Sequence, residues 1–402
     1  MRVKEAASLV ALTHDPGGAE ALVPLLSELS SNDHLNVIVY AGGKGRGVLD
    51  REGFQVHCVE VQGGDCPEWT TYGQELIRRH GADLVLTGTS FVPGPELGLL
   101  RAARILLVPA IAVLDQWTNY HRRFSGPGES ALDADALPDV VAVMDDFATQ
   151  EMVSEGFPLD RLRVVGHPGL ERFSRWVSSS EGQEAGQDVR SALGLKSCDI
   201  LVSFFSQPIS DLYGTDTGTT SRGYDEQQVF LGLREALAMI VREEKTSVRL
   251  VVKLHPKEFK GKYPKEEEDE FSFTMVESSG GDAILAASDL VVGMTSMALI
   301  KAFVAGKQVI SYQPDLIGPD AMVLGRAGYL ETAKTPDMFV DQIRCAVTGR
   351  QTVRTENRLS RALTDGGSVG RLMALIQELL EDTLRVDGLG AEVCARQEHV
   401  RT

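Results

Sequence analysis

Polar side chains that could bind a phosphate follow two apolar runs in the second half of the chain. Residues 249–254 are short, β-branched and apolar enough to form a buried strand, and His255-Pro256 follows them directly. Residues 289–292 form a second such run, and Thr295-Ser296 comes shortly after it, where an apolar helix begins. The free N–H groups and the dipole at a helix start favour an anion by about 0.3–1 kcal/mol. We therefore expect His255, Thr295 and Ser296 to hold a phosphate.

The elements that position these residues read as strand, helix and strand. A third apolar run, 308–312, follows the helix, so the pattern predicts parallel strands whose polar loops meet at their carboxyl ends. His255 is expected on a strand that neighbours the one before Thr295. Ser206-Gln207 follows another predicted strand, 198–205. Two simpler interpretations stay open, since Thr295-Ser296 could only cap its helix and His255-Pro256 could only form a turn.

The first half of the chain repeats this arrangement. A predicted strand, 8–12, runs into His14-Asp15, and Gly17-Gly18 then opens a helix where the backbone could approach a ligand closely. Thr89-Ser90 follows the predicted strand 82–87 in the same way. The glycine-rich segment 42–47 lacks the GxxxxGK[ST] pattern of a phosphate-binding loop and is expected to be a surface loop.

An unusual polar and aromatic cluster follows a further predicted strand, 105–113. It contains Asp115, Trp117 and Asn119, in a protein with three tryptophans. An aromatic ring beside carboxylate and amide groups suits sugar stacking and hydroxyl binding. Alternatively, Trp117 covers the edge of the core.

Composition limits the class of protein. The 402 residues suffice for two domains, and the net charge of −17 argues against a general nucleic-acid or anionic-membrane binder. Five cysteines without CxxC spacing indicate free thiols in a reducing compartment, so a cytoplasmic location is expected. Neither a signal peptide nor a membrane span is predicted, so any membrane contact would be peripheral. We expect neither a metal site nor a cofactor, and a homodimer is possible.

The predicted organisation is two α/β domains with a linker near 170–195. Residues 1–170 form the first Rossmann-like domain and 195–365 the second. An amphipathic helix within 366–385 is expected to pack back on the first domain, and 386–402 form a tail. The segment 211–225 is rich in glycine and threonine and is a candidate lid. The charged run 257–270 is interpreted as a solvated insertion.

A family resemblance rests on the second-half motifs. A strand ending in His255-Pro256, followed by SDLVV, Thr295-Ser296 and FVAGK, resembles the nucleotide-binding half of GT-B glycosyltransferases. It is most similar to bacterial sialyl- and polysialyltransferases and to CDP-glycerol glycerophosphotransferases. The resemblance implies two Rossmann-like parallel-sheet domains facing a central cleft, with a C-terminal helix crossing back.

The resemblance also implies an activity, that of an inverting, metal-independent glycosyltransferase. A nucleotide-sugar donor would bind to the second domain, and a carbohydrate or other hydroxyl acceptor to the first. The expected nucleotide-binding residues are His255, Pro256, Thr295, Ser296, Ser206 and Gln207. The expected acceptor-binding residues are Gly17, Gly18, Thr89, Ser90, Asp115, Trp117 and Asn119.

Transfer to a hydroxyl also needs a base, which contributes about 10²–10⁴-fold to the rate. Asp15, beside His14, is the first candidate, because related sialyltransferases carry an acidic base in a similar position of a D/E-D/E-G motif. His14-Asp15-Pro16-Gly17 matches that motif in part. Asp115 is the second candidate, and a helix-capping role for Asp15 stays open.

Two other functions fit the same architecture. One is a non-hydrolysing nucleotide-sugar 2-epimerase, although the HxEAGxR segment of those enzymes does not occur in this sequence. The other is a non-catalytic protein that binds a nucleotide or sugar. Release of nucleotide that depends on an acceptor would indicate a transferase, and interconversion of two sugars would indicate an epimerase.

Overall fold

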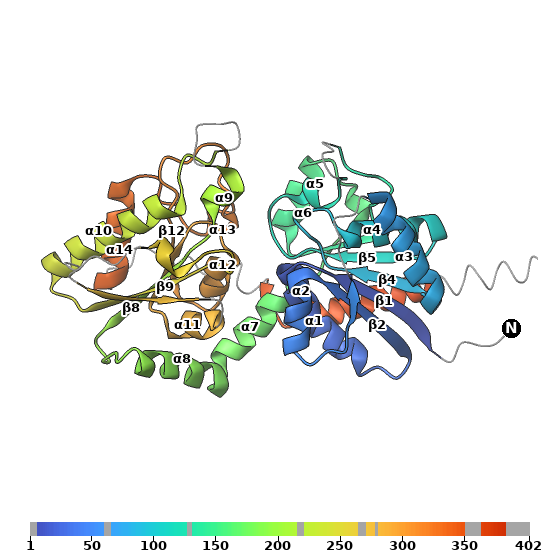
Figure 1. Ribbon diagram of the computed structural model, residues 1–402, viewed down its shortest axis with the longest axis horizontal. Helices are drawn as coiled ribbons and strands as arrows, with labels where there is room; N and C mark the ends of the chain where they lie inside the picture. Colours follow the sequence, from blue (N-terminus) through green and yellow to red (C-terminus); the bar gives the residue numbers. More distant parts are fainter. Residues whose placement is uncertain are drawn as a thin grey trace, which may run out of the picture. The chain divides into compact units, whose positions relative to one another are not determined.

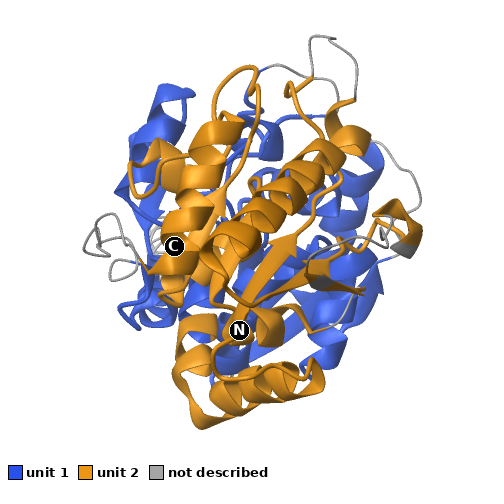
Figure 2. Cartoon of the chain, turned by 90° about the vertical axis from the view of Figure 1, so that its left-hand side faces the viewer, with its two compact units in different colours: residues 1–172, 362–402 blue, residues 173–361 orange. Residues whose placement is uncertain are grey.

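The computed structural model describes residues 6–59, 66–126, 131–214, 221–263, 271–277, 280–349 and 363–382. The chain divides into two compact units, 1–172 with 362–402 (unit 1) and 173–361 (unit 2), coloured separately in Figure 2. The division falls at Phe173, at the start of the predicted linker. Each unit is built on its own parallel sheet, so the predicted pair of Rossmann-like α/β domains is confirmed.

Unit 1 contains a seven-stranded sheet in the order β3-β2-β1-β4-β5-β6-β7, and every pair of neighbours is parallel. The switch in order between β1 and β4 is the place where an open parallel sheet leaves a crevice at its carboxyl ends. The strands are β1 (Ala7–Thr13), β2 (Leu35–Gly42), β3 (His57–Val59), β4 (Leu84–Thr87), β5 (Ala110–Val113), β6 (Val140–Val143) and β7 (Leu162–Val164).

Helices connect these strands and cover both faces of the sheet (Figure 1). Leucines spaced along α1 pack on one face, whereas α4 contacts β1, β4 and β5. The helices are α1 (Pro16–Ser30), α2 (Gly43–Arg51), α3 (Cys66–His80), α4 (Pro95–Leu106), α5 (Tyr120–Arg123), α6 (Asp146–Ser154) and α7 (Pro168–Ser178), with a 3-10 turn at Leu159–Arg161. The last of these helices runs across the division between the units.

A helix near the end of the chain, residues 368–382, belongs to unit 1. Leu372 and Ile376 are buried in the same apolar cluster as α1, and the Arg371 guanidinium donates to the backbone oxygen of Val165 at 2.8 Å. The predicted C-terminal helix that crosses back to the first domain is therefore confirmed. The predicted tail, 386–402, lies outside the described residues.

Unit 2 contains a five-stranded parallel sheet in the order β10-β9-β8-β11-β12. One face packs against α10 and α14, and the other packs against α8, α11 and α12. The strands are β8 (Ile200–Phe205), β9 (Val248–Lys253), β10 (Ser272–Val276), β11 (Leu290–Gly293) and β12 (Gln308–Ser311). The helices are α8 (Ser180–Ala192), α9 (Ile209–Tyr213), α10 (Glu226–Glu244), α11 (Gly281–Ala287), α12 (Met297–Val304), α13 (Val323–Arg326) and α14 (Pro336–Thr348), with a 3-10 turn at Lys260–Lys262.

Several expectations from the sequence are corrected. Segment 42–47 is not a surface loop, because α2 begins at Gly43. The predicted strand 105–113 is the end of α4 followed by the shorter β5, because an apolar run alone does not distinguish a buried helix from a strand. Much of the candidate lid (215–220) and of the charged insertion (264–270) lies outside the described residues. Within the described part of the chain, no helix is long and apolar enough to cross a membrane.

Candidate active site

The carboxyl ends of β1 and β4 bring together a histidine and a buried glutamate. His14 follows β1, and Glu96 lies in the first turn of α4, where it is 4% exposed. The Glu96 carboxylate accepts the backbone N–H of His14 at 2.7 Å and contacts its Nδ1 at 2.9 Å. Ser90, after β4, donates to the same carboxylate at 2.8 Å and lies 2.9 Å from Nδ1. The imidazole is therefore held in one orientation.

The two charges in this cluster stabilise each other. Burial alone would lower the pKa of His14, but the hydrogen bond and the negative charge of Glu96 outweigh it, so the pKa is raised. Burial alone would raise the pKa of Glu96, but its bond to His14 outweighs that effect and lowers the pKa. His14 can therefore exist as an imidazolium whose counterion is a carboxylate, an arrangement suited to proton transfer near neutral pH.

Asp15 lies on the accessible side of this pair. Its carboxylate is 3.8 Å from Nε2 of His14, and its side chain is 37% exposed. It occupies the N-cap position of α1, yet its side chain caps no helix N–H and instead accepts the N–H of Phe91 at 3.3 Å. Burial and the nearby Glu96 and Asp115 carboxylates raise the pKa of Asp15 despite the opposing effect of His14. Asp15 and His14 are therefore two titratable groups whose side chains lie 3.8 Å apart.

A buried ion pair supports the glycine-rich start of α1. Asp115, after β5, accepts hydrogen bonds from Arg123 at 2.6 Å and from Thr89 at 3.0 Å. A Cβ on Gly17 would lie 2.2 Å from the Asp115 carboxylate, and one on Gly18 would lie 3.1 Å from the backbone oxygen of Thr89. Both positions therefore favour glycine, because neighbouring protein atoms fill the space that a side chain would need. Packing against Asp115 explains why position 17 is a glycine, and the close approach of a ligand there stays a prediction.

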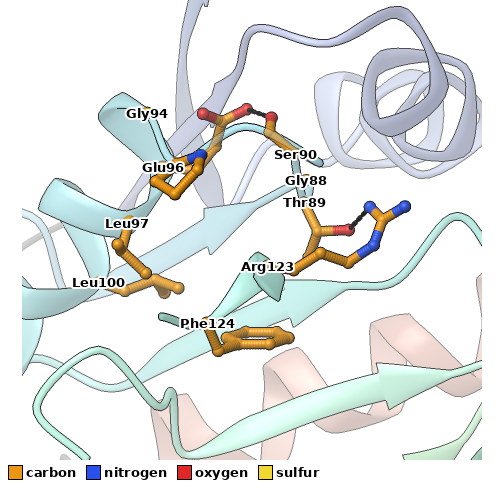
Figure 3. Close-up of a pocket in the computed structure, with 10 residues that line it drawn as sticks. Gly88, Thr89, Ser90, Gly94, Glu96, Leu97, Leu100, Arg123 and Phe124 are labelled. Carbon is orange, nitrogen blue, oxygen red and sulfur yellow. Dashed lines mark hydrogen bonds between the residues drawn. The ribbon is translucent and has the colours of Figure 1, made fainter. Parts of the chain in front are cut away.

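A small cavity lies beside these residues (Figure 3). Thr89, Ser90, Glu96 and Arg123 give it a polar side, and leucines of α4 give it an apolar side. Its size is about that of one water molecule. The cavity can hold a small polar group next to Glu96, and it is too small for a sugar ring.

Trp117 and Asn119 do not join this cluster as a stacking platform. Trp117 is 1% exposed, its indole N–H donates to Asp145 at 2.9 Å, and its ring stacks on His167. Trp117 is thus buried, in agreement with the alternative interpretation that it covers the edge of the core. Asn119 is exposed in a left-handed conformation at the start of α5, and its amide donates to Thr118 at 3.3 Å.

In unit 2, the expected phosphate-binding residues lie at the carboxyl ends of three strands. The strand order corrects one expectation: β9, which leads to His255, is not next to β11, which leads to Thr295, because β8 lies between them. Gln207, in the loop after β8, contacts Thr295 through its side-chain amide. Its side-chain oxygen accepts the backbone N–H of Thr295 at 2.7 Å, and its amide nitrogen donates to Thr295 Oγ1 at 3.2 Å.

Ser296 completes this side of the site. It occupies the N-cap position of α12, but its side chain caps no helix N–H. Its Oγ is buried and has no hydrogen-bond partner among the described residues. The hydroxyl and the first N–H groups of α12 are therefore suited to bind an anion rather than to satisfy each other.

The His255 side of the site is fixed by Glu258. Its carboxylate accepts the backbone N–H of His255 and the hydroxyl of Ser206, both at 2.8 Å, and lies 3.0 Å from the Lys262 ammonium. Lys262 also contacts Glu226 at the start of α10. Ser206 therefore supports the loop through its contact with Glu258. Pro256, next to His255, is exposed and has no polar side-chain atom to offer a ligand.

Three of these site residues were not identified from the sequence. Glu96 is the one charged residue between positions 91 and 100, and an isolated glutamate in such an apolar helix could have indicated a buried partner. The roles of Arg123 and Glu258 depend on contacts between loops that no local pattern reveals. Among the described residues, no group of three or more His, Cys, Asp or Glu side chains could hold a metal ion.

No protein-family model matches the chain, and no curated protein sequence matches it. Solved structures do match. UDP-GlcNAc 2-epimerase from Neisseria meningitidis, bound to UDP-GlcNAc, has a TM-score of 0.68 at 11% identity, covering 92% of this chain and 100% of that one. UDP-GlcNAc 2-epimerase from Methanocaldococcus jannaschii, in complex with UDP-GlcNAc and UDP, has a TM-score of 0.63 at 10% identity, covering 92% and 99%.

A third match is HepE from Anabaena in complex with UDP, with a TM-score of 0.57 at 17% identity, covering 93% of this chain and 100% of that one. These neighbours correct the predicted activity. The enzymes named among them are 2-epimerases, which are isomerases, so the prediction of an inverting glycosyltransferase is wrong, and the specific likeness to sialyltransferases is not supported. At these identities the likeness shows the fold, which is the two-domain GT-B architecture that the epimerases share.

Proposed function

We propose that the protein binds a uridine-diphosphate sugar and epimerises the sugar at C2. The observation that carries the proposal is the contact of His14 with both Glu96 and Asp15 at the carboxyl ends of β1 and β4. The fold supports it, because matching structures are named as UDP-GlcNAc 2-epimerases and are bound to UDP-GlcNAc or UDP. The uridine nucleotide is inferred from those neighbours.

The chemistry of such a reaction explains why the cluster in unit 1 suits it. C2 of a nucleotide sugar has no carbonyl beside it, so its proton becomes removable when the diphosphate on C1 departs with the C1–O bonding electrons. A base takes the C2 proton, and a C1=C2 double bond forms. Return of the diphosphate to C1 and of a proton to the opposite face of C2 gives the epimer. The reaction therefore needs groups that both accept and donate a proton.

Asp15 and His14 are proposed as these proton-transfer groups. Asp15 is accessible, and burial raises its pKa, which makes its carboxylate a stronger base than an ordinary aspartate. His14 is held by Glu96, which positions the imidazole and favours its protonated form. The HxEAGxR segment of known epimerases is absent, so proton transfer in this protein would use different residues from those in that segment.

The cluster in unit 2 is proposed to hold the nucleotide diphosphate. Ser296 offers a buried hydroxyl with no partner among the described residues, at the start of α12, and Gln207 orients Thr295 beside it. Hydrogen bonds to a charged oxygen contribute about 1.5–3 kcal/mol each. Such contacts would stabilise the charge on a departing diphosphate as well as bind it.

Incubation of the protein with UDP-GlcNAc in D₂O tests the proposal. We expect the C2 epimer, UDP-N-acetylmannosamine, to form, and deuterium to appear at C2, both detected by proton NMR. The matched variants are His14→Gln and Asp15→Asn, which should still bind UDP but lose at least about 100-fold in turnover. If UDP binds but no UDP-sugar exchanges a proton or changes configuration, the protein is a nucleotide-sugar-binding protein and the proposed epimerase is wrong.

A further inference from the structure

A buried lysine lies at the end of β9, two residues before His255. Lys253 is 7% exposed. Its backbone oxygen accepts the N–H of Ser206 at 3.0 Å, so it is joined to the loop whose next residue, Gln207, orients Thr295. Lys253 therefore belongs to the same strand-end loops as the residues proposed to hold the diphosphate.

The Lys253 ammonium has fewer partners than its three N–H groups could satisfy. In the described part of the chain, its Nζ donates to the backbone oxygen of Leu254 at 2.9 Å, and no carboxylate lies within ion-pair distance. Burial lowers its pKa, and the charge of Glu258 offsets this only in part. Nearby Lys262, in contrast, contacts two carboxylates, those of Glu226 and Glu258. Among the described residues, Lys262 is thus paired with two carboxylates, whereas the buried Lys253 ammonium has a single backbone acceptor.

We propose that Lys253 is a phosphate-binding residue, which donates its remaining N–H groups to the diphosphate of a bound uridine nucleotide. An anionic oxygen is the partner that a buried ammonium lacks here, because it supplies both the acceptors and the opposite charge. The ammonium is desolvated when the unit folds, before any ligand binds. Less free energy is then lost at binding than for a lysine that must leave water. The inference rests on the proposed binding of UDP and adds a residue to that site.

Lys307 provides a matched control in the same unit. It is partly buried, its Nζ donates to the backbone oxygen of Ala286 at 2.6 Å, and burial lowers its pKa as well. It precedes β12 and so lies at the amino edge of the sheet, whereas Lys253 ends β9 at the carboxyl edge. The two lysines share their chemistry and differ in which edge of the sheet they occupy.

The experiment compares Lys253→Met with Lys307→Met by calorimetric titration with UDP and with uridine. We expect Lys253→Met to weaken UDP binding by about 10- to 100-fold, as loss of a hydrogen bond to a charged group predicts. Binding of uridine, which carries no phosphate, should change little. Lys307→Met should bind both ligands as the wild type does. Equal UDP affinity in the two variants would overturn the assignment.

Thermal unfolding without ligand separates a binding role from a structural one. Removing a buried, weakly paired ammonium should leave the Tm of Lys253→Met unchanged or higher, because the cost of desolvating the charge disappears. A lower Tm with unchanged UDP affinity would make Lys253 a structural cation and overturn the inference. Failure of the wild-type protein to bind UDP would instead refute the proposed function, so the two failures are distinguishable.

Discussion

Replacing Glu96 by glutamine tests the buried pair on which the candidate active site depends. The substitution keeps the shape of the side chain and its ability to accept from Ser90 and from the backbone of His14, but it removes the charge. Glu96 is 4% exposed and the His14 side chain is 16% exposed, so solvent screens the pair weakly. The loss of a hydrogen bond between charged groups predicts a destabilisation of about 1.5–3 kcal/mol.

The destabilisation should depend on pH in a defined direction. The folded-state pKa of His14 is raised above its ordinary 6.5, so its contribution is complete below pH 6.5 and is lost as pH rises through the folded value. The folded-state pKa of Glu96 is lowered below its ordinary 4.5, so its contribution is present above pH 4.5 and is lost as pH falls through the folded value. The difference between wild type and Glu96→Gln should therefore be largest between pH 4.5 and 6.5.

Urea denaturation of both proteins from pH 4 to 9 measures this difference. Histidine-selective NMR gives a second measurement, with the His14 signal assigned through His14→Gln. In Glu96→Gln the opposing bond is gone and burial dominates, so the pKa of His14 should fall below 6.5. A stability difference that does not vary with pH, together with an unchanged His14 pKa, would refute the electrostatic account of the pair.

Three further substitutions test separate contacts. Gly17→Ala places a Cβ 2.2 Å from the Asp115 carboxylate and should lower the free energy of unfolding by about 1–3 kcal/mol in urea; a neutral effect would contradict the packing described. Gln207→Ala removes the side-chain hydrogen bonds to Thr295 and should weaken UDP binding about 10-fold by calorimetry, with the melting temperature as control. Trp117→Phe should reduce stability by about 1–2 kcal/mol through the lost indole N–H bond but leave sugar binding unchanged, and a selective loss of sugar affinity would restore its role as a stacking surface.

The sequence predicted the elements of the fold well where they were buried parallel strands. Runs such as 8–12 and 249–254 are mostly apolar because both faces of each sheet are covered, which is the strongest local signal of a parallel sheet. It failed at α2, whose glycines predicted a loop. Position 45 is a glycine because a Cβ there would lie 2.8 Å from the backbone of His14. Tertiary packing thus places glycine in a helix despite its low helix propensity.

The candidate site was predictable in its location but less so in its contacts. Polar residues at strand ends identified His14, Asp15 and Thr295, because parallel strands expose their carboxyl ends at one edge. Their partners depend on the order of strands in the sheet, which the sequence does not contain. The position of β8 between β9 and β11 is one example, and the meeting of β4 and β1 that brings Glu96 to His14 is another.

The helix at residues 368–382 has a consequence for how the protein forms. Its Leu372 and Ile376 complete an apolar core whose other buried members lie between Leu9 and Val165. During synthesis, residues 1–172 leave the ribosome with part of that core uncovered, and they remain so until the last segment is made. We expect residues 1–172 to stay prone to aggregation until then. A nonsense mutation anywhere before position 368 would therefore leave the apolar core of unit 1 incomplete.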